Sequence, residues 1–207
     1  MSQAFIHNPA TYRAVLRADQ DAPAPSVTRS PVPVYKGGVM RPGAKIRIAL
    51  NEAYPDAYSI VSILQGLTDQ FARDPLIREF TVNEVLCSSR NNDISFHVGK
   101  VTDFVMEYLI YTRDPVGSEY VISPVNLIAQ IQAGGKPTGD CDDHVLLLNS
   151  MLGSVGVPTK VVAVKLNGSD LFNHVISSVY VENGWQDIDP CAKEVAQPTY
   201  QEKLVAV

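Results

Sequence analysis

Hydrophobic residues recur with regular spacing from about residue 45 to the end of the chain. Alternating apolar and polar positions rich in β-branched residues predict strands, and apolar residues three or four positions apart predict amphipathic helices. The predicted strands are 45–50, 80–86, 159–166, 174–181 and 185–189. The first predicted helix starts at about residue 55 and ends before residue 74. Three more predicted helices span 95–112, 124–132 and 141–155. This pattern predicts one α+β domain over residues 45–207.

The last third of the chain carries the clearest signals. Gly139-Asp140 is typical of a helix start, and Gly156 is typical of a helix end. Asn183-Gly184 is typical of a tight turn between two antiparallel strands. We therefore expect a helix followed by three antiparallel strands, with the helix packed on the sheet.

Residues 1–44 differ from the rest of the chain, because six of the 14 prolines lie there. Proline cannot pair in the centre of a sheet, and the segment 21–33 has no helical period. Two interpretations stay open for this segment. It is either a flexible leader or an extended arm that lies on a protein partner or a neighbouring subunit.

Composition and charge narrow the class of protein. The chain has 207 residues and a net charge of -5, and it has no clustered cations of the kind that bind nucleic acid. No apolar run reaches the length of a membrane span, and the first residues lack the pattern of a signal peptide. Three widely spaced cysteines do not fit a secreted disulfide framework. We expect a protein of the cytoplasm, or of a particle assembled there, that binds neither nucleic acid nor membrane.

Three residues of the last third fit nucleophilic catalysis. Cys141 is predicted at a helix N-terminus, where partial positive charge and free N–H groups favour a thiolate. His174 begins one predicted strand and can accept and return a proton. Asp189 ends the next strand and can fix the imidazole tautomer. The order Cys, His, Asp therefore predicts a nucleophile, a base and an orienting carboxylate.

Several short motifs surround these residues in a fixed order. They are Gly139-Asp140-Cys141-Asp142-Asp143-His144, Gly156-Val157-Pro158-Thr159-Lys160, the strand that begins at His174, Gly184-Trp185 and Asp189-Pro190. Together they resemble the core of the transglutaminase-like superfamily over residues 139–190. A weaker resemblance to short stand-alone members from bacteria and phages extends back to residue 111.

The resemblance implies a papain-like fold and cysteine acyl chemistry, in which a thioester forms and water or an amine resolves it. Cys141 would be the nucleophile, His174 the base and Asp189 the orienting residue. It implies a protein or peptide substrate and no cofactor or metal. Hydrolysis of a peptide or amide bond is favoured over cross-linking, because water is always available.

The resemblance also allows a role without catalysis. A transglutaminase-like domain with an extended arm could serve as a structural or assembly protein, for example in a phage particle. The second donor to the oxyanion is the open question. Large family members use an upstream tryptophan, whereas this chain has only Trp185, downstream of Cys141. The alternatives considered are Tyr108, Tyr111, Gln130 and Gln132.

Other uses of the same residues are weighed against catalysis. Cys141, His144, His174 and Cys191 could bind zinc, but the helix-start context favours a nucleophile. The carboxylates of Asp140, Asp142 and Asp143 could bind a cation, although capping of the helix is preferred. His144 is interpreted as flanking or solvent-facing, and Cys87 as a small core residue.

The predicted turn conflicts with the predicted triad. A two-residue loop of Asn183 and Gly184 pairs residues whose numbers sum to 367, so that Asp189 faces Ser178. His174 then lies four residues away along the strand, which is roughly 13 Å. The triad therefore needs a bulge, a different turn or strongly splayed strands, and we predict that the turn is not a plain two-residue loop.

Overall fold

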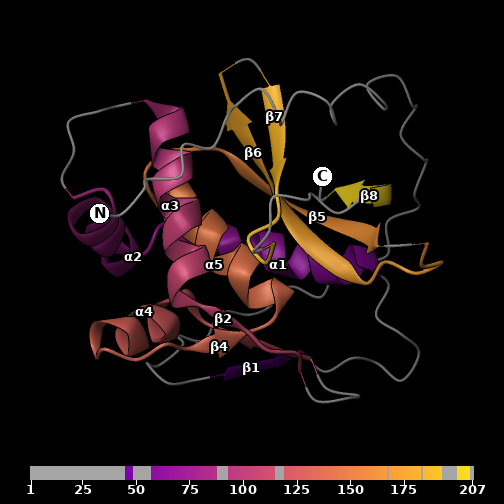
Figure 1. Cartoon of the computed structure of the whole chain (residues 1–207), viewed down its shortest axis with the longest axis horizontal. Helices are drawn as coiled ribbons and strands as arrows, with labels where there is room; N and C mark the ends of the chain where they lie inside the picture. The colour runs from indigo at the N-terminus through magenta and orange to yellow at the C-terminus, as the bar shows by residue number, and fades with distance from the viewer. Residues whose placement is uncertain are drawn as a thin grey trace, which may run out of the picture. The chain divides into compact units, whose positions relative to one another are not determined.

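The structure is a computed structural model that describes residues 45–48, 57–87, 93–114, 119–166, 168–182, 184–192 and 200–205 (Figure 1). Its helices are α1 (Ala57–Phe71), α2 (Pro75–Phe80), α3 (Ile94–Tyr108), α4 (Pro124–Gln132) and α5 (Cys141–Ser154), and the π-helix η2 (Thr81–Val85) continues α2. Its strands are β1 (Lys45–Ile48), β2 (Ile110–Tyr111), β3 (Glu119–Ile122), β4 (Thr138–Gly139), β5 (Thr159–Leu166), β6 (His174–Val181), β7 (Gly184–Ile188) and β8 (Tyr200–Val205). This mixture of helices and antiparallel strands confirms the predicted α+β class.

The main sheet has the strand order β7-β6-β5-β8, and every neighbouring pair is antiparallel. Two small sheets lie outside it. One pairs β1 with β3, and the other pairs β2 in parallel with β4. The parallel pair sets Tyr111 opposite Gly139, two residues before the start of α5. Segments that are far apart in the sequence thereby meet beside Cys141.

Helix α5 lies at the centre of the domain, where it contacts the other four α-helices and packs with α1 against the main sheet (Figure 1). Almost all of its side chains are buried, because it packs against α1 and α3 as well as β5 and β6. One of its sides contributes Leu147, Leu148, Met151 and Leu152 to one core cluster, and another contributes Val145 and Leu146 to a second. A helix buried on all sides is held firmly, so the residue at its first position has a fixed place.

Most predicted elements are confirmed, some with shifted ends. The predicted strand at 80–86 is wrong, because this segment forms the end of α2 and then η2. Buried positions recur there as Phe80, Thr81, Val85 and Leu86, which is helical spacing, and the Thr81 hydroxyl donates to the Ile77 carbonyl at 2.7 Å. Asp74 caps the helix that leads into this segment, and its carboxylate accepts from Leu76 N–H.

Other findings also depart from the sequence predictions, which did not include α2 or the short strands β2, β3 and β4. Strand β8 pairs with β5 and gives the main sheet a fourth strand. Cys87 is exposed and has a φ of 51°, so its interpretation as a core residue is wrong. The proposed arm, residues 1–44, lies outside the described residues. Among the residues that the structure describes, no helix has both the length and the apolar character needed to cross a membrane.

Candidate active site

Cys141 is the first residue of α5, and the sequence before it builds a rigid helix start. The Asp140 carboxylate accepts from Asp142 N–H at 3.0 Å, and the Asp143 carboxylate accepts from Asp140 N–H at 3.3 Å. The second bond and the donation of Asp143 N–H to the Asp140 side chain form a capping box, which confirms the preferred role of Asp140 as the cap. A Cβ at Gly139 would lie 2.5 Å from Asp143 Oδ2, so the cap needs glycine there.

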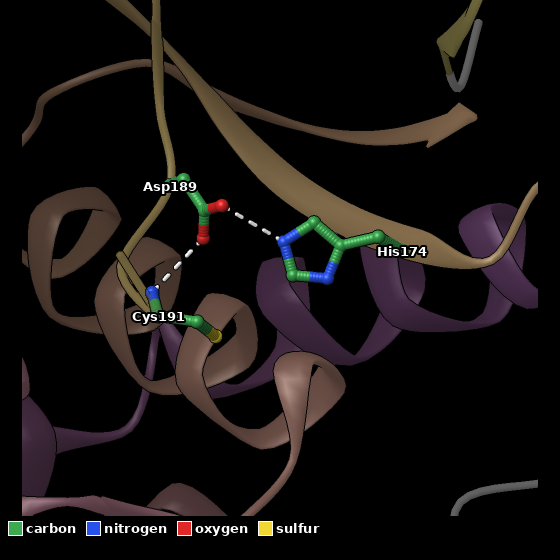
Figure 2. Close-up of side chains that lie close together, drawn as sticks. All are labelled: His174, Asp189 and Cys191. Atoms are coloured by element: carbon green, nitrogen blue, oxygen red, sulfur yellow. Dashed lines mark hydrogen bonds and ion pairs between the residues drawn. The ribbon is translucent and has the colours of Figure 1, made fainter. Parts of the chain in front are cut away.

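His174 and Asp189 lie in direct contact at the ends of β6 and β7 (Figure 2). The imidazole Nε2 lies 2.9 Å from Asp189 Oδ2, and the two side chains are only 8% and 5% exposed. Asp189 Oδ1 accepts from Cys191 N–H at 2.9 Å, which fixes the carboxylate from its other side. Because Nε2 faces Asp189, the ring keeps Nδ1 for a different partner.

The register of the β6–β7 hairpin explains this contact. Val181 pairs with Gly184, so two residues connect the strands, and the connection begins one residue earlier than predicted. Glu182 has a φ of 48°, as a tight turn requires. The prediction that the turn is not a two-residue loop is therefore wrong. Continuing the observed register sets Asp189 opposite Ile176, only two residues from His174. Such diagonal neighbours are roughly 7 Å apart on the same face of a sheet.

The start of α5 meets the start of β6. The backbone N–H of Val175 is near enough to the Cys141 thiol to lower its pKa, and α5 packs along β6. Val175 directly follows His174, so the sulfur lies beside the strand that carries the imidazole. The structure therefore brings Cys141, His174 and Asp189 into one neighbourhood.

The electrostatics of Cys141 differ from the sequence prediction. Burial raises the pKa of its thiol well above the usual value, and the charges of Asp142 and Asp140 raise it further. The Val175 N–H lowers it, but by less. The thiol lies 3.7 Å from Asp142 Oδ1, to which a protonated sulfur can donate. These effects together favour the neutral thiol over the thiolate that the helix N-terminus was expected to favour.

Among the four residues considered as oxyanion donors, Tyr111 is the one that interacts with Cys141. Partial burial and the nearby Cys141 raise the pKa of its hydroxyl, and a hydrogen bond with Arg113 lowers it by less, so the hydroxyl stays protonated. Tyr108 instead stacks on Phe104 with ring centroids 4.8 Å apart, and the Gln130 amide donates to Asn126 on the exposed side of α4. Gln132 is exposed at the end of α4.

His144 is only 2% exposed, so its interpretation as a solvent-facing residue is wrong. Its Nδ1 lies 2.7 Å from the Asp140 carbonyl oxygen, and its Nε2 lies 3.2 Å from the Leu109 carbonyl oxygen. Both ring nitrogens therefore face backbone carbonyls. This removes His144 from the zinc set considered above and gives it a role in holding the start of α5 to the end of α3.

Cys191 belongs to the site but was not assigned to it from the sequence, apart from the zinc alternative. One imidazole nitrogen of His174, one carboxylate oxygen of Asp189 and the sulfur of Cys191 all lie within 4.8 Å of one another (Figure 2). Burial raises the pKa of the Cys191 thiol, and the charge of Asp189 raises it further. Cys191 is therefore a neutral thiol beside the imidazole. The only sequence signal was its position two residues after Asp189.

Comparison with known families agrees with this geometry. The family model of the transglutaminase-like superfamily matches residues 85–190, just over half of the chain. The chain belongs to the transglutaminase-like superfamily. The matched segment of this transglutaminase-like domain contains Cys141, His174 and Asp189. No curated protein matches the sequence significantly.

Three solved structures are similar to parts of this transglutaminase-like domain. A candidate protease from Parabacteroides distasonis is 16% identical with a TM-score of 0.46, over 65% of this chain and 26% of its own. A candidate cysteine protease from Cytophaga hutchinsonii is 14% identical with a TM-score of 0.46, over 69% and 54%. LapG of Legionella pneumophila is 21% identical with a TM-score of 0.41, over 66% and 76%. The chain thus spans about a quarter of the first protein and about half of the second.

Proposed function

We propose that this domain is a cysteine hydrolase that cleaves a peptide or amide bond through Cys141, His174 and Asp189. The observation that carries the proposal is the contact between His174 Nε2 and Asp189 Oδ2, at 2.9 Å, beside the first residue of α5. Membership of the transglutaminase-like superfamily supports acyl chemistry. The proposed substrate is a protein or a peptide.

The first half-reaction transfers the acyl group to sulfur. Cys141 Sγ attacks the substrate carbonyl carbon while Nδ1 of His174 accepts the thiol proton. The C–N bond then breaks, and His174 returns the proton to the leaving amine, which gives a thioester and a free amine. In the second half-reaction His174 accepts a proton from water, the hydroxide attacks the thioester carbonyl, and the thiol leaves with that proton.

The raised pKa of Cys141 favours a neutral thiol in the resting protein. We therefore expect proton transfer to His174 to accompany the attack. Asp189 favours the imidazolium that forms, since its carboxylate accepts from Nε2–H. We expect the backbone N–H of Cys141 and the hydroxyl of Tyr111 to donate to the oxyanion.

A second function, that of a structural or assembly protein without catalysis, is favoured by one specific observation. Asp140 and Asp142 both raise the pKa of the Cys141 thiol, whereas a nucleophilic cysteine is usually found in positive surroundings. In this role the domain would keep the fold, and residues 1–44 would act as an arm for a protein partner. The two functions differ in whether Cys141 accepts an acyl group.

Acylation by p-nitrophenyl acetate tests this difference directly. We expect the wild-type protein to release nitrophenolate and to carry an acetyl group on Cys141, located by peptide mass spectrometry. His174→Ala should slow acylation by roughly 100-fold or more, since the general base contributes that much. Cys87→Ala, which removes an exposed thiol outside the site, is the matched control. Acetylation at equal rates in wild type and His174→Ala would contradict the enzyme function and favour the structural one.

A further inference from the structure

The thiol of Cys191 lies beside the proposed catalytic pair of His174 and Asp189. Its sulfur, one nitrogen of His174 and one oxygen of Asp189 lie within 4.8 Å of one another, from three residues at the ends of β6 and β7 (Figure 2). The proposed hydrolysis uses His174 and Asp189 but gives Cys191 no task. A thiol, an imidazole and a carboxylate that converge in this way are the three donor types of zinc sites.

We propose that His174, Asp189 and Cys191 bind one thiophilic divalent cation of the zinc class. The separations fit such an ion after a small adjustment. Ligand atoms of tetrahedral zinc are roughly 3.3–3.8 Å apart, given the usual bond lengths. His174 Nε2 and Asp189 Oδ2 are 2.9 Å apart and must open slightly, while the sulfur moves inward. The mixed nitrogen, oxygen and sulfur set disfavours calcium and magnesium, which prefer oxygen ligands alone.

The backbone already orients two of the three ligands. Asp189 Oδ1 accepts from Cys191 N–H at 2.9 Å, so the carboxylate and the cysteine are fixed relative to each other. His174 and Asp189 are almost fully buried, whereas Cys191 is half-buried. Three protein ligands leave a fourth position for water, as in zinc sites that are not purely structural.

The surrounding charge favours a cation. Among the neighbouring carboxylates, Asp189 raises the pKa of the Cys191 thiol most, and Asp140 and Asp142 raise it further. The negative potential that opposes a thiolate at this place attracts a divalent ion. Binding releases the thiol proton of Cys191, and the imidazole proton moves from Nε2 to Nδ1 so that Nε2 can ligate.

Metal binding at this site has a consequence for the proposed function. A bound ion occupies Nε2 of His174 and leaves a proton on Nδ1, the atom proposed to accept the proton of Cys141. The ion would therefore inhibit hydrolysis. This consequence rests on the proposed function, but the binding of the metal does not, and it is measured without any substrate.

Cobalt titration of the full-length, reduced and metal-free protein tests the site, because Co²⁺ replaces zinc and gives a thiolate charge-transfer band in the near ultraviolet. We expect saturation at one Co²⁺ per chain, with Zn²⁺ displacing the band. Cys191→Ser should lose the band and bind Zn²⁺ roughly 100-fold or more weakly, since even outer-shell changes reach that size. Cys87→Ser should keep the band, and so should Cys141→Ser, because the proposal does not use the nucleophile as a ligand.

Two results would overturn the proposal. One is a wild-type protein without the band, and the other is a band that survives Cys191→Ser or disappears in Cys141→Ser. Thermal melting checks that each variant is folded. A measurement without any variant guards against misfolding: Zn²⁺ should slow alkylation of Cys191 in the wild type by about tenfold or more, read by peptide mass spectrometry. Equal alkylation with and without Zn²⁺ would also overturn the site, whatever the outcome of the acylation experiment.

Discussion

Asp189 lies diagonally across the β6–β7 hairpin from His174, and its Oδ2 is 2.9 Å from the imidazole Nε2. This contact depends on the pairing of Val181 with Gly184. Had the loop formed at Asn183 and Gly184, as the sequence favours, the two side chains would be four residues apart along the strand. A shift of the loop by one residue along the chain therefore decides whether Asp189 can contact and orient the His174 imidazole.

Asp189→Asn tests the role of this contact in the proposed hydrolysis. The neutral amide lacks the charge that favours the imidazolium. Where its nitrogen donates to Nε2, the imidazole proton must also sit on Nδ1, which then cannot accept the thiol proton. We expect kcat/KM to fall by roughly 100-fold or more with little change in KM, because the loss occurs in the transition state. The matched control is Asp187→Asn on β7, which removes a carboxylate from the same hairpin. Equal rates for wild type and Asp189→Asn would remove Asp189 from the mechanism.

The sequence predicts the helix that carries Cys141 and the two strands that carry His174 and Asp189. It does so because alternation, Gly156 and the Asp140 cap are local signals. Strand β8 was not predicted, because its pairing with β5 joins segments that are far apart in the sequence. The segment 80–86 is misassigned because a short apolar run fits the period of a strand as well as that of a helix.

The parts of the site that sequence analysis misses depend on tertiary packing. His144 is a polar residue that pattern analysis assigns to the surface, yet two backbone carbonyls hold it in the interior. Cys191 reaches His174 only because the chain turns after Asp189, and Tyr111 reaches Cys141 only through the β2–β4 pair. The pKa of Cys141 also depends on packing, since burial outweighs the helix N-terminus.

Alkylation of Cys141 by iodoacetamide measures that pKa. Because burial and two carboxylates raise it, the rate should still be rising with pH above the ordinary range of free thiols, about 8.5. Asp142→Asn removes a neighbouring negative charge, so its rate profile should shift to lower pH. Asp103→Asn, on the exposed side of α3, should leave the profile unchanged. A fast plateau at acidic pH in the wild type would instead show a preformed thiolate.

Tyr111→Phe removes the hydroxyl proposed to donate to the oxyanion. We expect kcat to fall by roughly 100-fold while KM stays within a factor of about two, because the lost hydrogen bond forms only in the transition state. Tyr108→Phe is the matched control, since its ring stacks on Phe104 and is not linked to Cys141. A rise in KM with unchanged kcat would show that Tyr111 binds substrate instead.

Asp143 gives the protein a pH-dependent stability. Burial raises the pKa of its carboxyl to about 8, although Ile122 N–H donates to it at 2.6 Å. Between the unfolded pKa of 3.8 and the folded pKa of about 8, the native state holds a proton that the unfolded chain releases. Its contribution to stability is thus complete below pH 3.8 and is lost as pH rises through 8, at about 1.4 kcal/mol per pH unit within this window.

Asp143→Asn isolates this effect. The amide oxygen can still accept from Ile122 N–H, but the amide nitrogen cannot accept from Asp140 N–H, so the variant should lose about 1 kcal/mol at pH 5. Its free energy of unfolding should then fall much less between pH 5 and 8, and it should become the more stable protein at the alkaline end. Urea unfolding at pH 5, 6, 7 and 8 would measure both slopes. Cys141 and Cys191 do not interfere, because their raised pKa values place their effect above this window. Parallel curves for the two proteins would show that Asp143 is ionised throughout and acts as a charged cap.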